Sequence, residues 1–67
     1  MINITVNGDT QRHARPIPLS ELLHTMALAG KKIAVERNGE IVPRGAHTAT
    51  MIADGDRLEI VVAVGGG

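Results

Sequence analysis

The sequence predicts a single α+β domain in which one helix lies across one face of a mixed five-stranded sheet. Three observations lead to this fold class. Several short segments alternate apolar and polar residues, one segment has the apolar spacing of a helix, and Asn, Asp and Gly cluster at three points between them. A sheet and a helix packed as two layers let all these segments bury their apolar faces.

The composition supports a small globular domain. The 67 residues are 43% hydrophobic and carry no net charge, whereas a disordered chain has few apolar residues and a large net charge. This length allows one domain, which we place at residues 1–67. A core this small leaves little room for a substrate pocket, so we expect that the protein is not an enzyme.

Residue types that the chain lacks exclude several classes of function. Without Cys it can form neither a disulfide nor a thiolate metal site. It has no basic tract and no aromatic side chain to stack on bases, so we expect no nucleic-acid binding. Its longest apolar run, Ile60 to Val64, is far shorter than the ~20 residues that span a bilayer. We therefore expect no membrane insertion and a cytoplasmic location.

The first two strands form a predicted hairpin. Residues 2–6 alternate apolar and polar side chains, as in a strand with one buried face. Asn7-Gly8-Asp9 is a tight-turn signal, since these residues tolerate a positive φ. The polar return segment, Thr10 to Arg15, is interpreted as an edge strand that ends before Pro16.

The helix is predicted from Leu19 to Ala29. Its apolar side chains recur at i, i+3, i+4 and i+7, which places them on one face. They are Leu19, Leu22, Leu23 and Met26. Glu21 in the first turn suits the positive end of the helix dipole, and Gly30 is expected at the C′ position.

A second hairpin is predicted after the helix. Residues 33–36 alternate as a strand, Asn38-Gly39 supplies the turn, and Glu40 to Val42 return as a short strand that Pro43 ends. The segment from Arg44 to Thr50 shows no clear period, so we expect a loop with at most one helical turn.

The last predicted strand is the most apolar one. It follows the turn Asp54-Gly55-Asp56, runs from Leu58 to Val64 and contains no Pro, which favours a central position in the sheet. The resulting order is strand, strand, helix, strand, strand, strand. This order is typical of a β-grasp, or ubiquitin-like, fold.

The two sides of this last strand are predicted to face different surroundings. We assign the apolar set Leu58, Ile60, Val62 and Val64 to the core that faces the helix. Glu59, Val61 and Ala63 then point to a sheet face that no second helix covers. We expect Val61 and Ala63 to bind partner proteins, with Glu59 at the rim of the contact.

Conventional catalytic and metal-binding groups are sparse. The imidazoles are His13, His24 and His47. Their spacing matches no compact metal motif, so we expect solvated histidines and no metal. Asp54 and Asp56 flank a glycine and are interpreted as turn residues that bond to nearby backbone amides. Ser20 lies at the predicted helix start, where serine usually supports the first turn.

The sequence ends in Gly65-Gly66-Gly67. Composition alone is equally compatible with an inert terminus. In the functional interpretation, residues 65–67 are a flexible tail that carries the Gly67 carboxylate about 10 Å beyond the last strand. Residues without Cβ can thread a channel that excludes side chains. The carboxylate is ionised near neutral pH; it can attack phosphorus, but it needs activation before a sulfur or nitrogen nucleophile can attack it.

Three stretches carry a family resemblance. They are Asn38 to Arg44, Asp54 to Val61 and Ala63 to Gly67, and the helix start Leu19 to Leu23 agrees with them. Together they resemble the ThiS family, the sulfur carrier proteins of thiamine biosynthesis. The Asn-Gly-Glu-Ile-Val-Pro-Arg stretch and the glycine terminus are specific in combination. The chain departs from the family pattern at Arg37, where a small or apolar residue is usual.

The resemblance implies a function and partners. In that family an E1-like adenylyltransferase consumes ATP to adenylate the C-terminal glycine, here Gly67. A sulfur donor, such as a cysteine desulfurase, then converts the acyl adenylate to a thiocarboxylate, and thiazole synthase takes the sulfur. The protein would therefore be a co-substrate without a bound cofactor of its own.

Three alternatives stay open at this point. The chain could be the related small sulfur-carrier subunit of molybdopterin synthase, although those chains are usually longer and differ from Asn38 to Arg44. It could be a ubiquitin-like modifier that forms isopeptide bonds, or a β-grasp interaction module with an inert tail.

Overall fold

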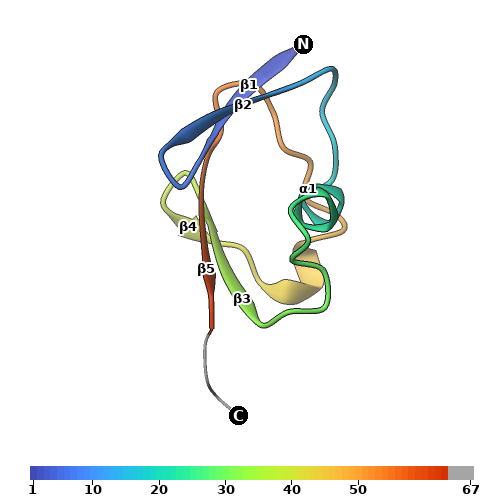
Figure 1. The fold of residues 1–67 in the computed structure, drawn as a ribbon, viewed down its shortest axis with the longest axis vertical. Coiled ribbons are helices and arrows are strands. Elements are labelled where there is room, and N and C mark those ends of the chain that lie inside the picture. Colours follow the sequence, from blue (N-terminus) through green and yellow to red (C-terminus); the bar gives the residue numbers. More distant parts are fainter. Residues whose placement is uncertain (64–67) are drawn as a thin grey trace.

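The computed structural model describes residues 1–63 of the chain and has a sheet on one side and a helix on the other (Figure 1). The five strands are β1 (Ile2–Val6), β2 (Asp9–His13), β3 (Ile33–Arg37), β4 (Glu40–Ile41) and β5 (Arg57–Val62). The helix α1 spans Leu19–Thr25, and a single 3-10 turn, η1, spans Arg44–Ala46. This turn lies in the segment for which the sequence predicts a loop with at most one helical turn.

The sheet is mixed and has the order β2-β1-β5-β3-β4. β1 and β5 are parallel, whereas the other neighbouring strands are antiparallel. The apolar strand β5 lies at the centre and the polar strand β2 lies at an edge, both as predicted. The β-grasp fold class is therefore confirmed.

One core lies between the sheet and α1. Alternate side chains of β1 point into it, and β3, β5, α1 and two loop segments contribute the rest. Its members are Ile2, Ile4, Val6, Ile17, Leu19, Leu22, Leu23, Val35, Ile52, Leu58 and Ile60. Burying an aliphatic side chain of this size contributes about 1.5–3 kcal/mol before the cost of ordering the chain, so this core accounts for the stability of a chain that has no aromatic residue.

Both hairpins use the predicted Asn-Gly turns. Asn7 and Gly8 have φ of 50° and 88°, and Asn38 and Gly39 have φ of 52° and 87°. Two consecutive residues with positive φ are the signature of a type I′ turn, whose twist matches that of the flanking strands. The return strand of the first hairpin is Asp9–His13, shorter at its end than the predicted Thr10 to Arg15.

The helix is shorter than predicted. It ends at Thr25 instead of Ala29, and the residue in the left-handed C′ position is Ala27, with a φ of 60°, instead of Gly30. A left-handed conformation costs an L-residue with a Cβ about 1–2 kcal/mol relative to the right-handed one. Tertiary contacts therefore decide where this helix ends.

Those contacts form a Schellman motif. The Leu28 amide donates to the Leu23 carbonyl oxygen (2.8 Å), and the Ala27 amide donates to that of His24 (3.0 Å). Leu28, which follows the left-handed residue, packs against the core. Its burial turns the chain back towards the sheet before the predicted end of the helix.

Backbone carbonyl groups satisfy the start of α1. The Leu19 amide donates to the Thr50 carbonyl oxygen (2.7 Å), and the Ser20 amide donates to that of His47 (3.0 Å). Pro18 is the N-cap residue, and no side chain caps the helix. α1 is neither long nor apolar enough to cross a membrane, and it is the one α-helix among the described residues.

Candidate functional site

The expected reactive residue, Gly67, and the expected tail residues, Gly65 and Gly66, lie outside the described residues, as does Val64. The structure describes the strand that leads to them. β5 runs through the middle of the sheet and leaves it at the lower end of the molecule in Figure 1. Its last described contact is a hydrogen bond from the Ala63 amide to the Lys32 carbonyl oxygen (2.8 Å). β3 therefore holds the chain up to four residues before Gly67.

The side chain of Asn7 holds the other flank of β5. Its Oδ1 accepts a hydrogen bond from the Ile60 amide (2.7 Å), and its Nδ2 donates to the Ile60 carbonyl oxygen (3.0 Å). The backbone of Asn7 also donates to Leu58 (2.9 Å). The side-chain amide of Asn7 thus acts as a peptide group would. It adds one more pair of hydrogen bonds to the ladder between β1 and β5, beyond the point at which β1 turns away.

Asn38, in the other hairpin turn, holds the beginning of β5. Its Oδ1 accepts from the Arg57 amide (2.9 Å), and its Nδ2 donates to Asp56 Oδ1 (3.1 Å). Arg37 Nε donates to Asp56 Oδ2 (2.9 Å), which also accepts from the Ala53 amide (2.8 Å). The departure of Arg37 from the family pattern is thus matched by an ion pair with Asp56.

Asp56 is a buried structural carboxylate. Its exposed fraction is 6%. Burial by itself would raise the pKa of Asp56, but hydrogen bonds from the Ala53 amide, Asn38 and Arg37 outweigh burial and hold the pKa below its usual value. The prediction that Asp54 and Asp56 bond to nearby backbone amides of their own turn is correct for Asp56, which accepts from the Ala53 amide. Asp54 Oδ1 instead accepts from the amide of Asn3 on β1 (2.7 Å), 51 positions away in the sequence.

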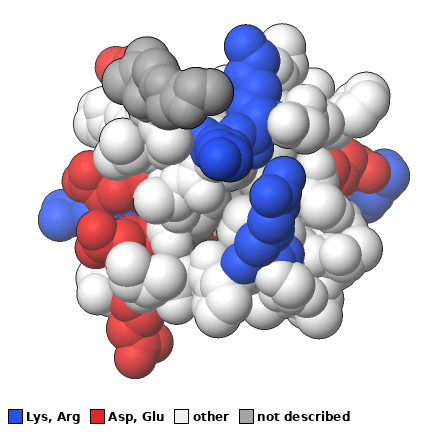
Figure 2. Space-filling view, turned by 90° about the horizontal axis from the view of Figure 1, so that it is seen from below, with Lys and Arg blue, Asp and Glu red and all other residues white. Residues whose placement is uncertain are grey.

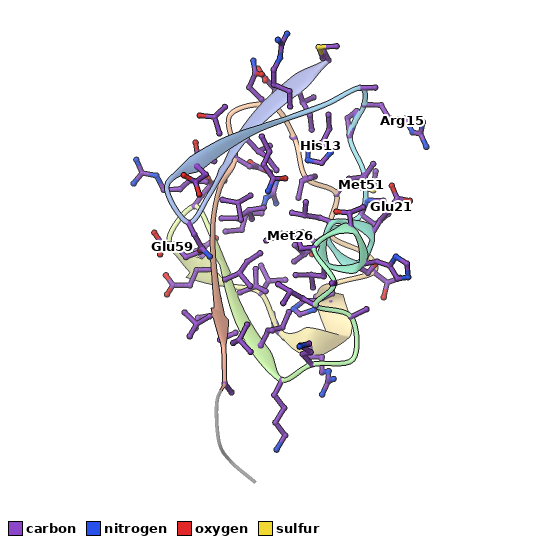
Figure 3. All side chains as sticks on the ribbon, in the orientation of Figure 1. His13, Arg15, Glu21, Met26, Met51 and Glu59 are labelled. Atoms are coloured by element: carbon purple, nitrogen blue, oxygen red, sulfur yellow. The ribbon has the colours of Figure 1, made fainter. Side chains whose placement is uncertain are left out.

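The outer face of the sheet, away from α1, carries the predicted docking residues. Glu59, Val61 and Ala63 are all exposed, and the exposed fraction of Val61 is 62%. Figure 3 shows Glu59 on the side of the sheet opposite the helix. Their orientation agrees with the prediction, whereas their role in binding partners stays a prediction.

Val62 does not belong to the core, and this part of the prediction is wrong. Its exposed fraction is 40%, whereas Leu58 and Ile60 on the same side of β5 are buried. Val62 pairs with Ile33 of β3, but β1 pairs with β5 only as far as Leu58. The end of β5 therefore extends past the neighbouring strand that would help to enclose Val62.

Two residues of the outer face escaped the sequence analysis. Glu36 pairs with Glu59 on one side and with Ile41, 69% exposed, on the other. The pairing of Glu36 with Ile41 could have been predicted from the sequence, because a two-residue Asn38-Gly39 turn fixes the register of the two strands that it joins. Two carboxylates directly opposite each other destabilise a sheet slightly, so this face combines apolar side chains with an acidic pair.

Charges are distributed unevenly around the end of the molecule at which β5 leaves the sheet. Figure 2 views this end, with Lys and Arg side chains near the centre and most of the visible Asp and Glu side chains on the left. The left is the side of the sheet in Figure 1. This end of the molecule thus has an acidic area on the side of the sheet and basic side chains nearer its centre.

The histidines are less solvated than predicted. His24 is exposed and His13 is half-buried, with its Nε2 3.1 Å from Gln11 Oε1. His47 is buried at 8% exposure, and its Nε2 donates to the Val42 carbonyl oxygen (3.2 Å). No group of three His, Cys, Asp or Glu residues within residues 1–63 is arranged to hold a metal ion.

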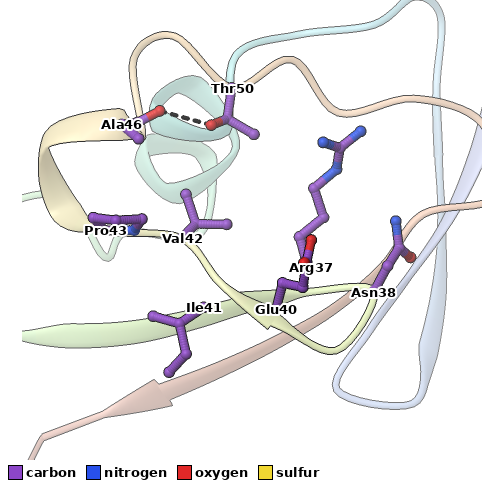
Figure 4. Close-up of a pocket in the computed structure, with 8 residues that line it drawn as sticks. All are labelled: Arg37, Asn38, Glu40, Ile41, Val42, Pro43, Ala46 and Thr50. Carbon is purple, nitrogen blue, oxygen red and sulfur yellow. Dashed lines mark hydrogen bonds between the residues drawn. The ribbon is translucent and has the colours of Figure 1, made fainter.

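Among the hollows of the described surface, two are open and of similar size. One, of about 250 Å³, lies between β4 and η1, where Thr50 Oγ1 donates to the Ala46 carbonyl oxygen (2.7 Å) (Figure 4). The other, of about 220 Å³, lies beside α1 and is lined in part by Lys31 and Arg44. Both are below the ~300–1,000 Å³ of typical ligand sites. Ser20 and His47 both line the second hollow, but His47 Nε2 donates to the Val42 carbonyl oxygen, and no described hydrogen bond joins the two side chains as a nucleophile and base would require.

Comparison with known proteins gives one consistent family. The profile of the ThiS family matches residues 3–67. The crystal structure of the thiamine biosynthesis protein (ThiS) from Geobacter metallireducens superposes with a TM-score of 0.83 at 38% identity, covering 98% of this chain and 100% of that one.

Curated relatives are of two kinds. The thiazole synthase of Paramagnetospirillum magneticum is 36% identical over 66 residues, which cover 98% of this chain but 20% of the synthase. The uncharacterised protein ycf40 of Pyropia yezoensis is 35% identical over 66 residues, which cover 98% of this chain and 93% of that protein. The chain thus spans about one fifth of the synthase that it matches, and nearly the whole of the smaller relative.

Proposed function

The chain belongs to the ThiS family, and we propose that it is a sulfur carrier of thiamine biosynthesis that serves partner enzymes as a co-substrate. The observation that carries this proposal is the family match over residues 3–67, which includes the terminal glycines.

The proposed chemistry takes place at the Gly67 carboxylate. On an E1-like adenylyltransferase, a carboxylate oxygen attacks the α-phosphorus of ATP, and pyrophosphate leaves. The persulfide sulfur of a donor such as a cysteine desulfurase then attacks the acyl carbon and displaces AMP. A thiol reductant cleaves the resulting acyl disulfide and leaves the thiocarboxylate, from which thiazole synthase takes the sulfur. A terminal carboxylate has a pKa of about 3.3–3.7 in model peptides, so it is ionised and nucleophilic towards phosphorus at neutral pH.

The curated relatives support thiazole synthase as a partner. Proteins named thiazole synthase contain a stretch that is 35–36% identical to almost the whole of this chain. Joining a carrier-like segment and a synthase in one polypeptide raises the effective concentration of each for the other. We propose that the same two functions act together here as separate or linked units.

We further propose that Glu59, Val61 and Ala63 contact these partners. Their exposure on the outer face supports the proposal, because an apolar surface next to a reactive terminus gains free energy when a partner covers it. Glu59 would remain at the rim, where a charge affects the rate of association more than the affinity.

The test is carrier-dependent exchange of pyrophosphate into ATP by the cognate E1-like enzyme. The wild-type chain should support exchange, and the chain without Gly67 should not. Gly66→Val should also fail, since a branched side chain does not fit a channel made for glycine. Thr10→Ala, on the distant edge strand β2, is the matched control and should behave as wild type. Undiminished exchange by the shortened chain would refute the assignment of Gly67.

A further inference from the structure

The backbone N–H and C=O groups of successive β5 residues face opposite flanks of the strand, and those of Val62 face away from β3. The Ala63 amide bonds to Lys32, and the Asn38 amide bonds to Arg57. In an antiparallel ladder such bonded pairs alternate with pairs whose polar groups point away. Glu59 and Val61 therefore bond towards β3, whereas the N–H and C=O groups of Val62 point to the opposite flank, where β1 lies.

On that flank the ladder ends at Ile60, two residues before Val62. β1 pairs with β5 up to Leu58, and Asn7 then satisfies both polar backbone groups of Ile60. Among residues 1–63, no strand continues alongside Val62. A central strand of the sheet thus becomes an edge strand over its last residues.

Within the part of the chain that the structure describes, this edge lacks the usual protection. Proteins usually blunt an exposed edge with Lys, Pro, a bulge or a covering loop. Here the edge residues Val61 and Val62 are apolar, β-branched and exposed at 62% and 40%. Such a segment has a strong preference for the extended conformation and presents free main-chain groups at its edge.

We infer that this edge of β5 at Val62 is a strand-addition site for an extended segment of the enzyme that activates Gly67. The inference rests on the proposed function. Gly67 lies five positions after Val62 in the sequence, which corresponds to roughly 17 Å of fully extended chain. A strand paired with Val62 would therefore fix the direction of the terminal residues towards an active site at that distance. Main-chain pairing supplies affinity in this mode, and the exposed Val side chains supply specificity.

Amide hydrogen exchange tests the inference directly. In the ¹⁵N-labelled free chain, the Val62 amide should exchange quickly, because it bonds to nothing described, whereas the Ile60 amide should be protected by Asn7. With saturating unlabelled activating enzyme and MgATP, exchange at Val62 should slow roughly tenfold or more, and Ile60 should stay protected. Equal exchange at Val62 in both samples would overturn the inference. Protection that already appears in the free chain and grows with its concentration would also overturn it, since a second copy would then be the occupant.

Substitutions at Val62 provide a second measurement. Val62→Pro removes the outward N–H without removing a bond to β3, so the fold should persist. It should lower kcat/KM for pyrophosphate exchange roughly tenfold or more, whereas Val62→Ala should stay within about threefold of wild type. A wild-type rate for Val62→Pro, or equal losses in both variants, refutes strand addition. If the wild-type chain itself supports no exchange, the proposed function fails, and the inference falls with it.

Discussion

The contact between Asn7 and Ile60 gives the most specific stability prediction. Asn7→Gly keeps the turn, because glycine adopts the φ of 50° without strain. It removes the two hydrogen bonds of 2.7 Å and 3.0 Å to Ile60. At about 0.5–1.5 kcal/mol net for each bond, the unfolding free energy should fall by about 1–3 kcal/mol. The whole domain is expected to have only about 3–10 kcal/mol.

Urea titration measures this loss. The chain contains no Trp or Tyr, so far-UV circular dichroism follows unfolding. The midpoint should shift without a change in the m-value, and Tm should fall by roughly 5–20 °C. Asn7→Asp keeps the acceptor for the Ile60 amide but sets a carboxylate oxygen against the Ile60 carbonyl oxygen, so it should also be less stable than wild type. If Asn7→Gly is as stable as wild type, the two hydrogen bonds from the Asn7 side chain contribute nothing to the unfolding free energy, and our description of β5 is wrong.

Three further predictions follow from the corrected fold. Ala27→Gly should raise the unfolding free energy by about 0.5–1 kcal/mol, because it relieves a φ of 60°, whereas the control Ala29→Gly should lower it; urea titration checks the two signs. The pKa of Asp56 is lowered in the folded state, so its stabilising contribution is present above the usual value of 3.8 and is lost as pH falls further. The difference in unfolding free energy between wild type and Asp56→Asn should therefore shrink below that pH, and a constant difference would contradict it. Val62→Asp should remain folded, because Val62 is 40% exposed. Val61→Asp should weaken partner binding in calorimetry without unfolding the domain. If either variant is unfolded at room temperature, the orientation that we assign to β5 is contradicted.

Local sequence patterns predicted most of the fold, because short-range chemistry determines those parts. The Asn-Gly turns need residues that tolerate positive φ, and alternation along residues 2–6 reports one buried face. The apolar character of β5 predicted its central position. Each of these features depends on residues that are neighbours in the sequence.

The errors come from contacts between distant parts of the chain. The helix ends at Thr25 because Leu28 packs into the core, although Ala27 has no preference for a left-handed conformation. Val62 follows the apolar period of β5, but the period does not show where β1 turns away. The contact between Asn7 and Ile60 joins residues 53 positions apart, so turn chemistry alone could not reveal it.

Part of the candidate site could have been derived from the sequence. The pairing of Glu36 with Ile41 follows from the two-residue turn at Asn38-Gly39, and the exposed side of Val61 follows from alternation. The free edge at Val62 could not be derived, since it requires the relative lengths of β1 and β5.

Intact-mass analysis of the wild-type chain tests the central claim most directly. The chain is incubated with its cognate E1-like enzyme, ATP and a sulfide source, and a sample without ATP serves as the control. We expect an ATP-dependent gain equal to one exchange of oxygen for sulfur, located at Gly67 by fragmentation. An unchanged mass, or the same gain in a chain with a residue appended after Gly67, would contradict the account of this protein as a sulfur carrier.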